Sequence, residues 1–194
     1  MTRHRVTDEV GAVSSRIPRQ SARDGGRNRP DVDAGLGAEL APVVSGARRR
    51  ALRDGDRQID TAHLLHSLLE SDPEVRAVFD GGAQVARLLG YLVQRSIGYG
   101  LRWQGTVEDS GAALAVAEEG WSPVAAGAMG ESYERAVLRG DERARGLDLL
   151  AALVSDPRSR AVEVLRRAGV DLPPLLERVE RGCAGRVAPG DAGR

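Results

Sequence analysis

The chain has 194 residues, of which 41% are hydrophobic and only 3% aromatic, so it can form one or two small domains with a core mainly of Leu, Val and Ala. Its 28 basic residues are all Arg and balance 28 acidic residues, which excludes an overall field that would attract nucleic acid or an anionic membrane. The lack of Lys excludes a lysine Schiff base and the phosphate-loop motif G-x-x-x-x-G-K-[ST].

Residues 1–35 are rich in Arg, Asp, Gly and Ser, and they carry too little apolar surface to offset the entropy cost of ordering. We predict a disordered leader there and a flexible tail over 183–194. Between them we predict two repeats, over 36–100 and 113–182, joined by a linker over 101–112.

The first predicted helix covers residues 38–55. Pro42 suits its first turn, where the missing N–H loses no hydrogen bond, and the segment RDGDRQ ends it. Apolar side chains recur along it at steps of three and four residues, which places them on one face. They are Leu40, Val43, Val44, Ala47, Ala51 and Leu52.

A second helix is predicted to begin near Thr61, whose hydroxyl would cap the free N–H groups of the first turn. Two doubled leucines give this helix a wide apolar stripe typical of a central core element. Asp72-Pro73 ends it and starts a third, short helix over EVRAVFD, because the residue before a proline avoids the helical conformation. A fourth helix is expected over GAQVARLLGYLVQRSIG.

The second half repeats this order. The pair Leu149-Leu150 follows Leu64-Leu65 after 85 residues, and Asp156-Pro157 follows Asp72-Pro73 after 84. The first helix of this second copy is predicted around Met129. A repeat of this length is a whole supersecondary unit, and two copies are expected to pack as a pseudo-twofold pair.

The tandem pattern resembles the double Clp repeat at the N-terminus of ClpC- and ClpA-type unfoldases, over about residues 38–181. The segments that carry the resemblance are IDTAHLLHSLLESDPEVRAV and AQVARLLGYLVQ in the first copy, and RGLDLLAALVSDPRSRAVEVLRRAGVDLPPLLERV in the second. The resemblance implies an all-α, eight-helix, pseudo-twofold domain that binds proteins or peptide-like ligands. In those unfoldases two ATPase modules follow the domain, so we expect this chain to be a stand-alone Clp N-domain protein.

Clp N-domains that recognise phosphoarginine carry a G-T-E-H-L-L motif in each repeat, and its glutamate binds the guanidinium group. In this chain those glutamate positions hold Ala62 and Leu147, neither of which can accept a hydrogen bond. Thr61 and His63 keep the motif in the first copy, whereas Gly146 and Asp148 replace them in the second. We therefore expect the usual phosphoarginine contacts to be missing.

The candidate ligand-binding residues follow from this resemblance and from the aromatic side chains near the groove expected between the repeats. They are Thr61, Ala62, His63, Phe79, Trp103, Trp121, Leu147 and Asp148. The two tryptophans are either binding anchors beside the groove or packing residues.

No metal or other cofactor is predicted. His63 and His66 have a spacing that can hold a metal, but no HExxH motif or cysteine partner accompanies them. Cys183 is the only cysteine, which excludes an intrachain disulfide and favours a cytoplasmic location, as does the lack of a signal peptide. Neighbouring arginines could lower its pKa, but no base is placed beside it for catalysis.

The leading functional hypothesis is a non-catalytic module of the Clp proteolysis system that captures a protein segment or a peptide-like ligand in an apolar groove between the repeats. Its partners would be Clp components and their clients, as an adaptor or as a ligand-sequestering decoy, with no membrane role. The alternative is a regulator that binds nucleic acid or a transcription factor through the Arg-bearing leader. An enzyme is not predicted, because three His, one Cys and no Lys do not assemble a nucleophile, a base and an orienting group.

Overall fold

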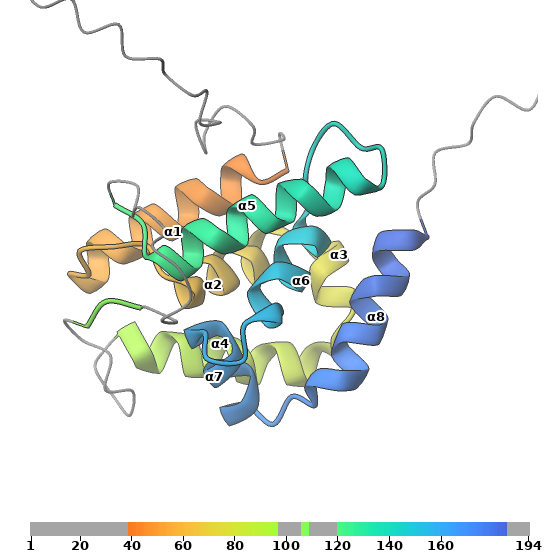
Figure 1. Ribbon diagram of the computed structural model, residues 1–194. Helices are drawn as coiled ribbons and strands as arrows, with labels where there is room; N and C mark the ends of the chain where they lie inside the picture. Colours follow the sequence, from red (N-terminus) through yellow and green to blue (C-terminus); the bar gives the residue numbers. More distant parts are fainter. Residues whose placement is uncertain (1–38, 97–105, 109–119, 186–194) are drawn as a thin grey trace, which may run out of the picture.

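The computed structural model describes residues 39–96, 106–108 and 120–185, which form eight α-helices (Figure 1). These are α1 (Ala41–Asp54), α2 (Thr61–Ser71), α3 (Pro73–Ala77), α4 (Gly81–Ser96), α5 (Pro123–Leu138), α6 (Gly146–Ser155), α7 (Arg160–Arg167) and α8 (Leu172–Ala184). The predicted all-α fold is confirmed. Within the same ranges, no helix is long and apolar enough to cross a membrane.

The two ends of helix α1 carry the residues that the sequence predicts for them, but one residue of its predicted apolar face is exposed. Pro42 lies in the first turn, and Gly55 ends the helix in the left-handed conformation, with a φ of 72°. Five of the six apolar residues predicted to share a face are buried. Leu52 is 75% exposed, so its assignment to the buried stripe was wrong.

Helix α2 is the central element of the first repeat, and its residues Thr61–Leu69 are all buried. Its N-cap is Asp60 rather than the predicted Thr61. The Asp60 carboxylate accepts the backbone N–H of His63 at 2.9 Å, and the Asp60 backbone N–H donates to Nδ1 of His63 at 3.1 Å. This reciprocal capping box satisfies two donors at the start of the helix.

The Asp-Pro pair works differently in the two repeats. Asp72 ends α2 and caps α3, because its carboxylate accepts the N–H groups of Glu74 and Val75. After Asp156-Pro157 the chain makes a turn first, and α7 begins at Arg160 with Ser159 as its N-cap. The two copies therefore share the leucine helix and the Asp-Pro pair, but they differ by one residue in the spacing between them and in the start of the helix that follows.

The two repeats pack reciprocally. Helix α1 packs on α2 as α5 packs on α6, and between the repeats α2 contacts α7 while α3 contacts α6. Figure 1 shows α1 and α5 on one side of the molecule and α4 and α7 on the opposite side, with α2 and α6 between them. This is the arrangement expected of a pseudo-twofold pair, and it places the first turns of helices from opposite repeats against each other.

The predicted boundaries agree only in part with the helices. Helix α8 extends to Ala184, so the predicted start of the tail at 183 is two residues too early, and Cys183 is a buried helical residue. The predicted leader, Trp103 and most of the predicted linker lie outside the described residues. The hypothesis of nucleic-acid binding through the leader therefore stays a prediction.

Candidate functional site

The carboxylate of Glu108 lies at the junction where α2 and α7 begin. Glu108 belongs to the segment between the repeats and is 6% exposed. It accepts the backbone N–H groups of Thr61 at 2.9 Å and Arg160 at 2.7 Å, and the hydroxyls of Thr61 and of Ser122, the N-cap of α5. The first turn of a helix exposes free N–H donors and a partial positive charge, so one carboxylate stabilises two helices at once.

The side chain of Arg160 completes this junction. Its guanidinium donates to the Asp60 carboxylate at 2.6 Å and to the carbonyl and hydroxyl of Thr106 at 2.7 and 2.8 Å. The Thr61 hydroxyl, which donates to Glu108, also accepts the backbone N–H of Ala161 at 3.0 Å. We call Asp60, Thr61, Thr106, Glu108, Ser122 and Arg160 the inter-repeat cluster. Its donors and acceptors pair with one another across the two repeats.

The matching junction between α6 and α3 is built differently. Gly146 replaces the threonine, and a Cβ placed on it would lie only 1.9 Å from an oxygen of Asp72 and 3.0 Å from a methyl of Val75. Here the carboxylate at the junction comes from Asp72, the N-cap of α3. The two junctions are thus related by the repeat but are not chemically equivalent, as the sequence indicated.

An open apolar pocket of about 530 Å³ lies on the first repeat, between α3 and α4. Phe79 and Val85 are its buried lining residues, and the exposed Ala77 and Ala86 are among those at its edge. Arg76 is the one charged residue in its lining, and its guanidinium donates to backbone carbonyls at the end of α2. The pocket therefore offers apolar contact area and holds no nucleophile.

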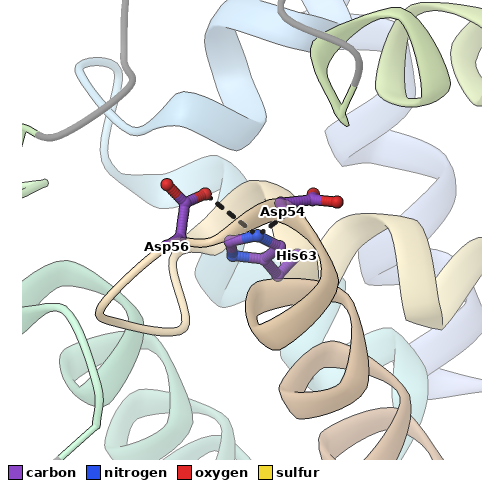
Figure 2. A group of neighbouring side chains, drawn as sticks. All are labelled: Asp54, Asp56 and His63. Carbon is purple, nitrogen blue, oxygen red and sulfur yellow. Dashed lines mark ion pairs between the residues drawn. The ribbon is translucent and has the colours of Figure 1, made fainter.

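A third group of side chains lies where α1 passes into α2. Asp54 ends α1, Asp56 follows in the turn, and His63 lies in the first turn of α2; one ligand atom from each falls within 4.8 Å of the others (Figure 2). Nε2 of His63 points at both carboxylates, at 3.6 Å from Asp54 and 3.3 Å from Asp56. His66 is not part of this group: its Nε2 faces Glu70 at 3.4 Å, and burial together with nearby Arg50 lowers the pKa of His66 to about 4.

Three solved structures share this helix arrangement with the chain. The N-terminal domain of the chaperone ClpD from Arabidopsis thaliana is 16% identical, with a TM-score of 0.53, covering 75% of this chain and 92% of that one. The Hsp104 N-terminal domain from Candida albicans is 11% identical, with a TM-score of 0.55, covering 74% and 88%. The chain has the fold of a Clp N-terminal domain. The sequence itself matches no family model and no curated protein.

A third structure similar to this chain comes from structural investigations of a malarial protein secretion system. It is 13% identical, with a TM-score of 0.56, and the match covers 80% of this chain and 99% of that one. At such low identities the likeness establishes the fold alone. The resemblance inferred from the tandem leucine helices is confirmed at that level.

Within this Clp N-domain fold, most of the residues predicted to bind a ligand are enclosed. Thr61, Ala62, His63, Leu147 and Asp148 are each at most 1% exposed. Trp121 is 3% exposed and forms an isolated parallel β-bridge with Ile59, which makes it a packing residue. Among the predicted residues in the described ranges, Phe79 alone lines the apolar pocket, and that pocket lies within one repeat rather than between the two.

Asp148 holds the start of α6 rather than an open site. Its carboxylate accepts the backbone N–H of Arg145 at 2.9 Å and pairs through both oxygens with the guanidinium of Arg139, whose pKa it raises. Sγ of Cys183 lies 3.6 Å from the same carboxylate. Burial, and next the Asp148 charge, raise the pKa of Cys183 to about 11, so the expectation that arginines lower it was wrong.

Sequence reasoning missed Glu108 and Arg160. Glu108 lies in the segment GTVEDSGA, which shows no helical or strand period, so no pattern marked it. Arg160 occupies the first position of an amphipathic helix, where a basic residue is unfavourable next to the positive end of the dipole. That local conflict was the one available signal, because it implies a nearby carboxylate.

Proposed function

We propose that this chain is a non-catalytic binding module that captures an apolar segment of a protein partner in the pocket between α3 and α4. The observation that carries the proposal is an open, almost entirely apolar pocket on a Clp N-terminal domain fold. Its volume is in the range of pockets that enclose a few side chains. As an enzyme site it lacks convergent polar groups.

The chemistry of the pocket fits a short run of aliphatic or aromatic side chains. Phe79 and Val85 contribute apolar atoms to the wall of the pocket, while the exposed small residues Gly81, Gly82, Ala77 and Ala86 let a peptide backbone approach closely. Such a run is buried in a folded protein and exposed in an unfolded one. We therefore propose that the partner is an unfolded or partly unfolded client, which the module delivers to, or withholds from, a Clp unfoldase.

Phosphoarginine is not the proposed ligand. The two positions where readers of that group carry glutamate hold Ala62 and Leu147, which are 0% and 1% exposed. In the first repeat, the Glu108 carboxylate already accepts the helix N–H groups. A phosphorylated ligand there would have to displace a buried acid and would meet no guanidinium acceptor.

The proposal is tested by fluorescence anisotropy with fluorescein-labelled, Leu- and Phe-rich peptides. Ala86→Glu places a carboxylate at the edge of the pocket and should weaken binding at least about tenfold, since a charge then has to be desolvated. The matched control is Ala83→Glu, on the same helix at an exposed position outside the pocket lining, which should bind like the wild type. Equal affinities of all three proteins for the peptides, or no binding by the wild type, would overturn the proposal.

A further inference from the structure

The strongest unexplained feature elsewhere in the molecule is the imidazole of His63. Its side chain is 1% exposed, and Nε2 is a buried polar atom with no hydrogen-bond partner. Buried polar atoms are almost always hydrogen-bonded, so an exception calls for a physical reason. Nε2 points toward the Asp54 and Asp56 carboxylates at distances too long for a good hydrogen bond (Figure 2).

The geometry points to a divalent transition-metal site formed by Asp54, Asp56 and His63. Metal–nitrogen and metal–oxygen bonds of about 2.0–2.2 Å at tetrahedral or octahedral angles separate neighbouring ligand atoms by roughly 3.0–3.5 Å. The observed separations from Nε2, 3.3 and 3.6 Å, are close to that range. One cation between the three atoms would replace two poor contacts with three bonds.

The surroundings of the ring fit the same assignment. Nδ1 of His63 lies 2.9 Å from Oδ1 of Asp60 and 3.1 Å from the Asp60 backbone N–H. Without a cation, Nδ1 accepts the Asp60 N–H, which places the proton of the neutral ring on Nε2. Binding a cation moves this proton to Nδ1, which then donates to the Asp60 carboxylate instead of accepting the backbone N–H, and the Nε2 lone pair is freed for the metal. A carboxylate behind a ligating histidine is the usual support of such sites, since it fixes the tautomer and the ring orientation.

The ligand types select the cation. One imidazole and two carboxylates suit Zn²⁺ and its first-row neighbours, whereas Mg²⁺ and Ca²⁺ prefer oxygen ligands alone. The three ligands come from the last residue of α1, the turn and the first turn of α2. A bound Zn²⁺ would therefore link the end of α1 to the start of α2. This start is capped by Asp60, which pairs with Arg160 of the other repeat.

The test is a titration of the full chain, purified free of metal, with Zn²⁺ by isothermal titration calorimetry and with Co²⁺ by visible absorption. We expect one ion per chain and a higher Tm when Zn²⁺ is present. Asp54→Asn and Asp56→Asn should each weaken binding by at least the roughly 10–100-fold typical of even outer-shell changes. Asp171→Asn, at an exposed helix start, and His66→Gln are the controls and should bind like the wild type.

A second measurement uses only the wild-type protein, so its result does not depend on whether a variant folds. In the wild type, addition of Zn²⁺ should shift the ¹⁵N resonance of His63 Nε2 and move the ring proton from Nε2 to Nδ1. An unshifted His63 resonance, affinities unchanged in both aspartate variants, or loss of binding in His66→Gln would each overturn the assignment. Because none of these residues lines the α3–α4 pocket, failure here and failure of peptide capture are separate outcomes.

Discussion

At the scale of single residues, Glu108 joins three segments of the chain through one charged group. Its carboxylate accepts four donors from three segments: the backbone and hydroxyl of Thr61, the hydroxyl of Ser122 and the backbone of Arg160. Hydrogen bonds to a charged acceptor are individually worth more than neutral ones. The junction therefore depends on the charge as well as on the shape of this side chain.

Glu108→Gln keeps the shape but removes the charge and turns an amide N–H toward other donors. We expect the free energy of unfolding to fall by about 2–3 kcal/mol, the cost of weakening charged hydrogen bonds and leaving a buried donor unpaired. Urea denaturation followed by circular dichroism measures this. The matched control, Glu177→Gln on the exposed side of α8, should change stability by less than about 0.5 kcal/mol. A Glu108→Gln protein as stable as that control would contradict the described role of the carboxylate.

Cys183 offers a second test at this scale, because it is the only thiol in the chain. Burial and the nearby Asp148 raise the pKa of Cys183 to about 11, so the folded state favours the protonated thiol. At pH 8 the thiolate fraction should be about 100-fold lower than for an exposed thiol of pKa 9, and reaction with a disulfide reagent correspondingly slow. This contribution to stability is complete below about pH 9 and is lost as the pH rises toward 11.

The measurement is the rate of thiol labelling at pH 8, in buffer and in urea. Labelling should be slow in buffer and should accelerate across the unfolding transition. Equally fast labelling in both conditions would show that the end of α8 does not pack against α6 as described.

At the scale of elements, the approach of α6 to α3 determines which residue the chain tolerates at position 146. Gly146→Ala would force a Cβ against the Asp72 carboxylate and Val75, so we expect a loss of about 1–3 kcal/mol of stability. Gly130→Ala, in the interior of α5 with no atom near its Cβ, is the matched control. It should raise stability by about 0.5–1 kcal/mol, since alanine favours helix. Thermal unfolding of both variants checks the opposite signs.

The elements that sequence reasoning located correctly are those whose signal is local. The doubled leucines of α2 and α6 mark helices that are buried on nearly every side, and Asp72-Pro73 both ends one helix and begins the next. Leu52 was misplaced because helical periodicity defines a stripe but not its edges, and those depend on which neighbour packs there. Thr61 was taken for the cap because Asp60 and Thr61 are both residue types that favour the N-cap position, so the pair left the helix start uncertain by one residue.

The features that sequence reasoning could not locate depend on contacts between distant residues. Arg160 and Asp60 are 100 positions apart, and Glu108 reaches Thr61 from 47 positions away. Nothing in the local pattern around any of them specifies the partner. The Asp54, Asp56 and His63 group is closer in sequence, but only the turn of the chain after Gly55 brings the two carboxylates in front of Nε2.

At the scale of the whole molecule, the inter-repeat cluster joins two units that the sequence presents as separate copies. The pairing of Arg160 with Asp60 is buried, at 8% and 1% exposure, and both residues lie at helix starts of different repeats. A buried pair adds little net stability compared with an apolar pair, but removing one partner leaves the other charge buried without compensation. The cluster is therefore expected to make the repeats unfold together.

Arg160→Leu tests this cooperativity. It leaves the buried Asp60 carboxylate and Thr106 without the guanidinium, so we expect the free energy of unfolding to fall by about 3–5 kcal/mol. In a Trp103→Phe background, Trp121 at the junction becomes the sole tryptophan, and its fluorescence reports the junction while circular dichroism reports all helices. The two urea transitions should coincide with Arg160 present and separate in the leucine variant, because the contacts of Trp121 then loosen before the leucine helices unfold.

Arg167→Leu, which breaks an exposed pair with Glu163, should shift both curves together by less than about 1 kcal/mol. Coincident transitions in Arg160→Leu would mean that apolar packing of α2 on α7 and of α3 on α6 couples the repeats without help from the charged cluster.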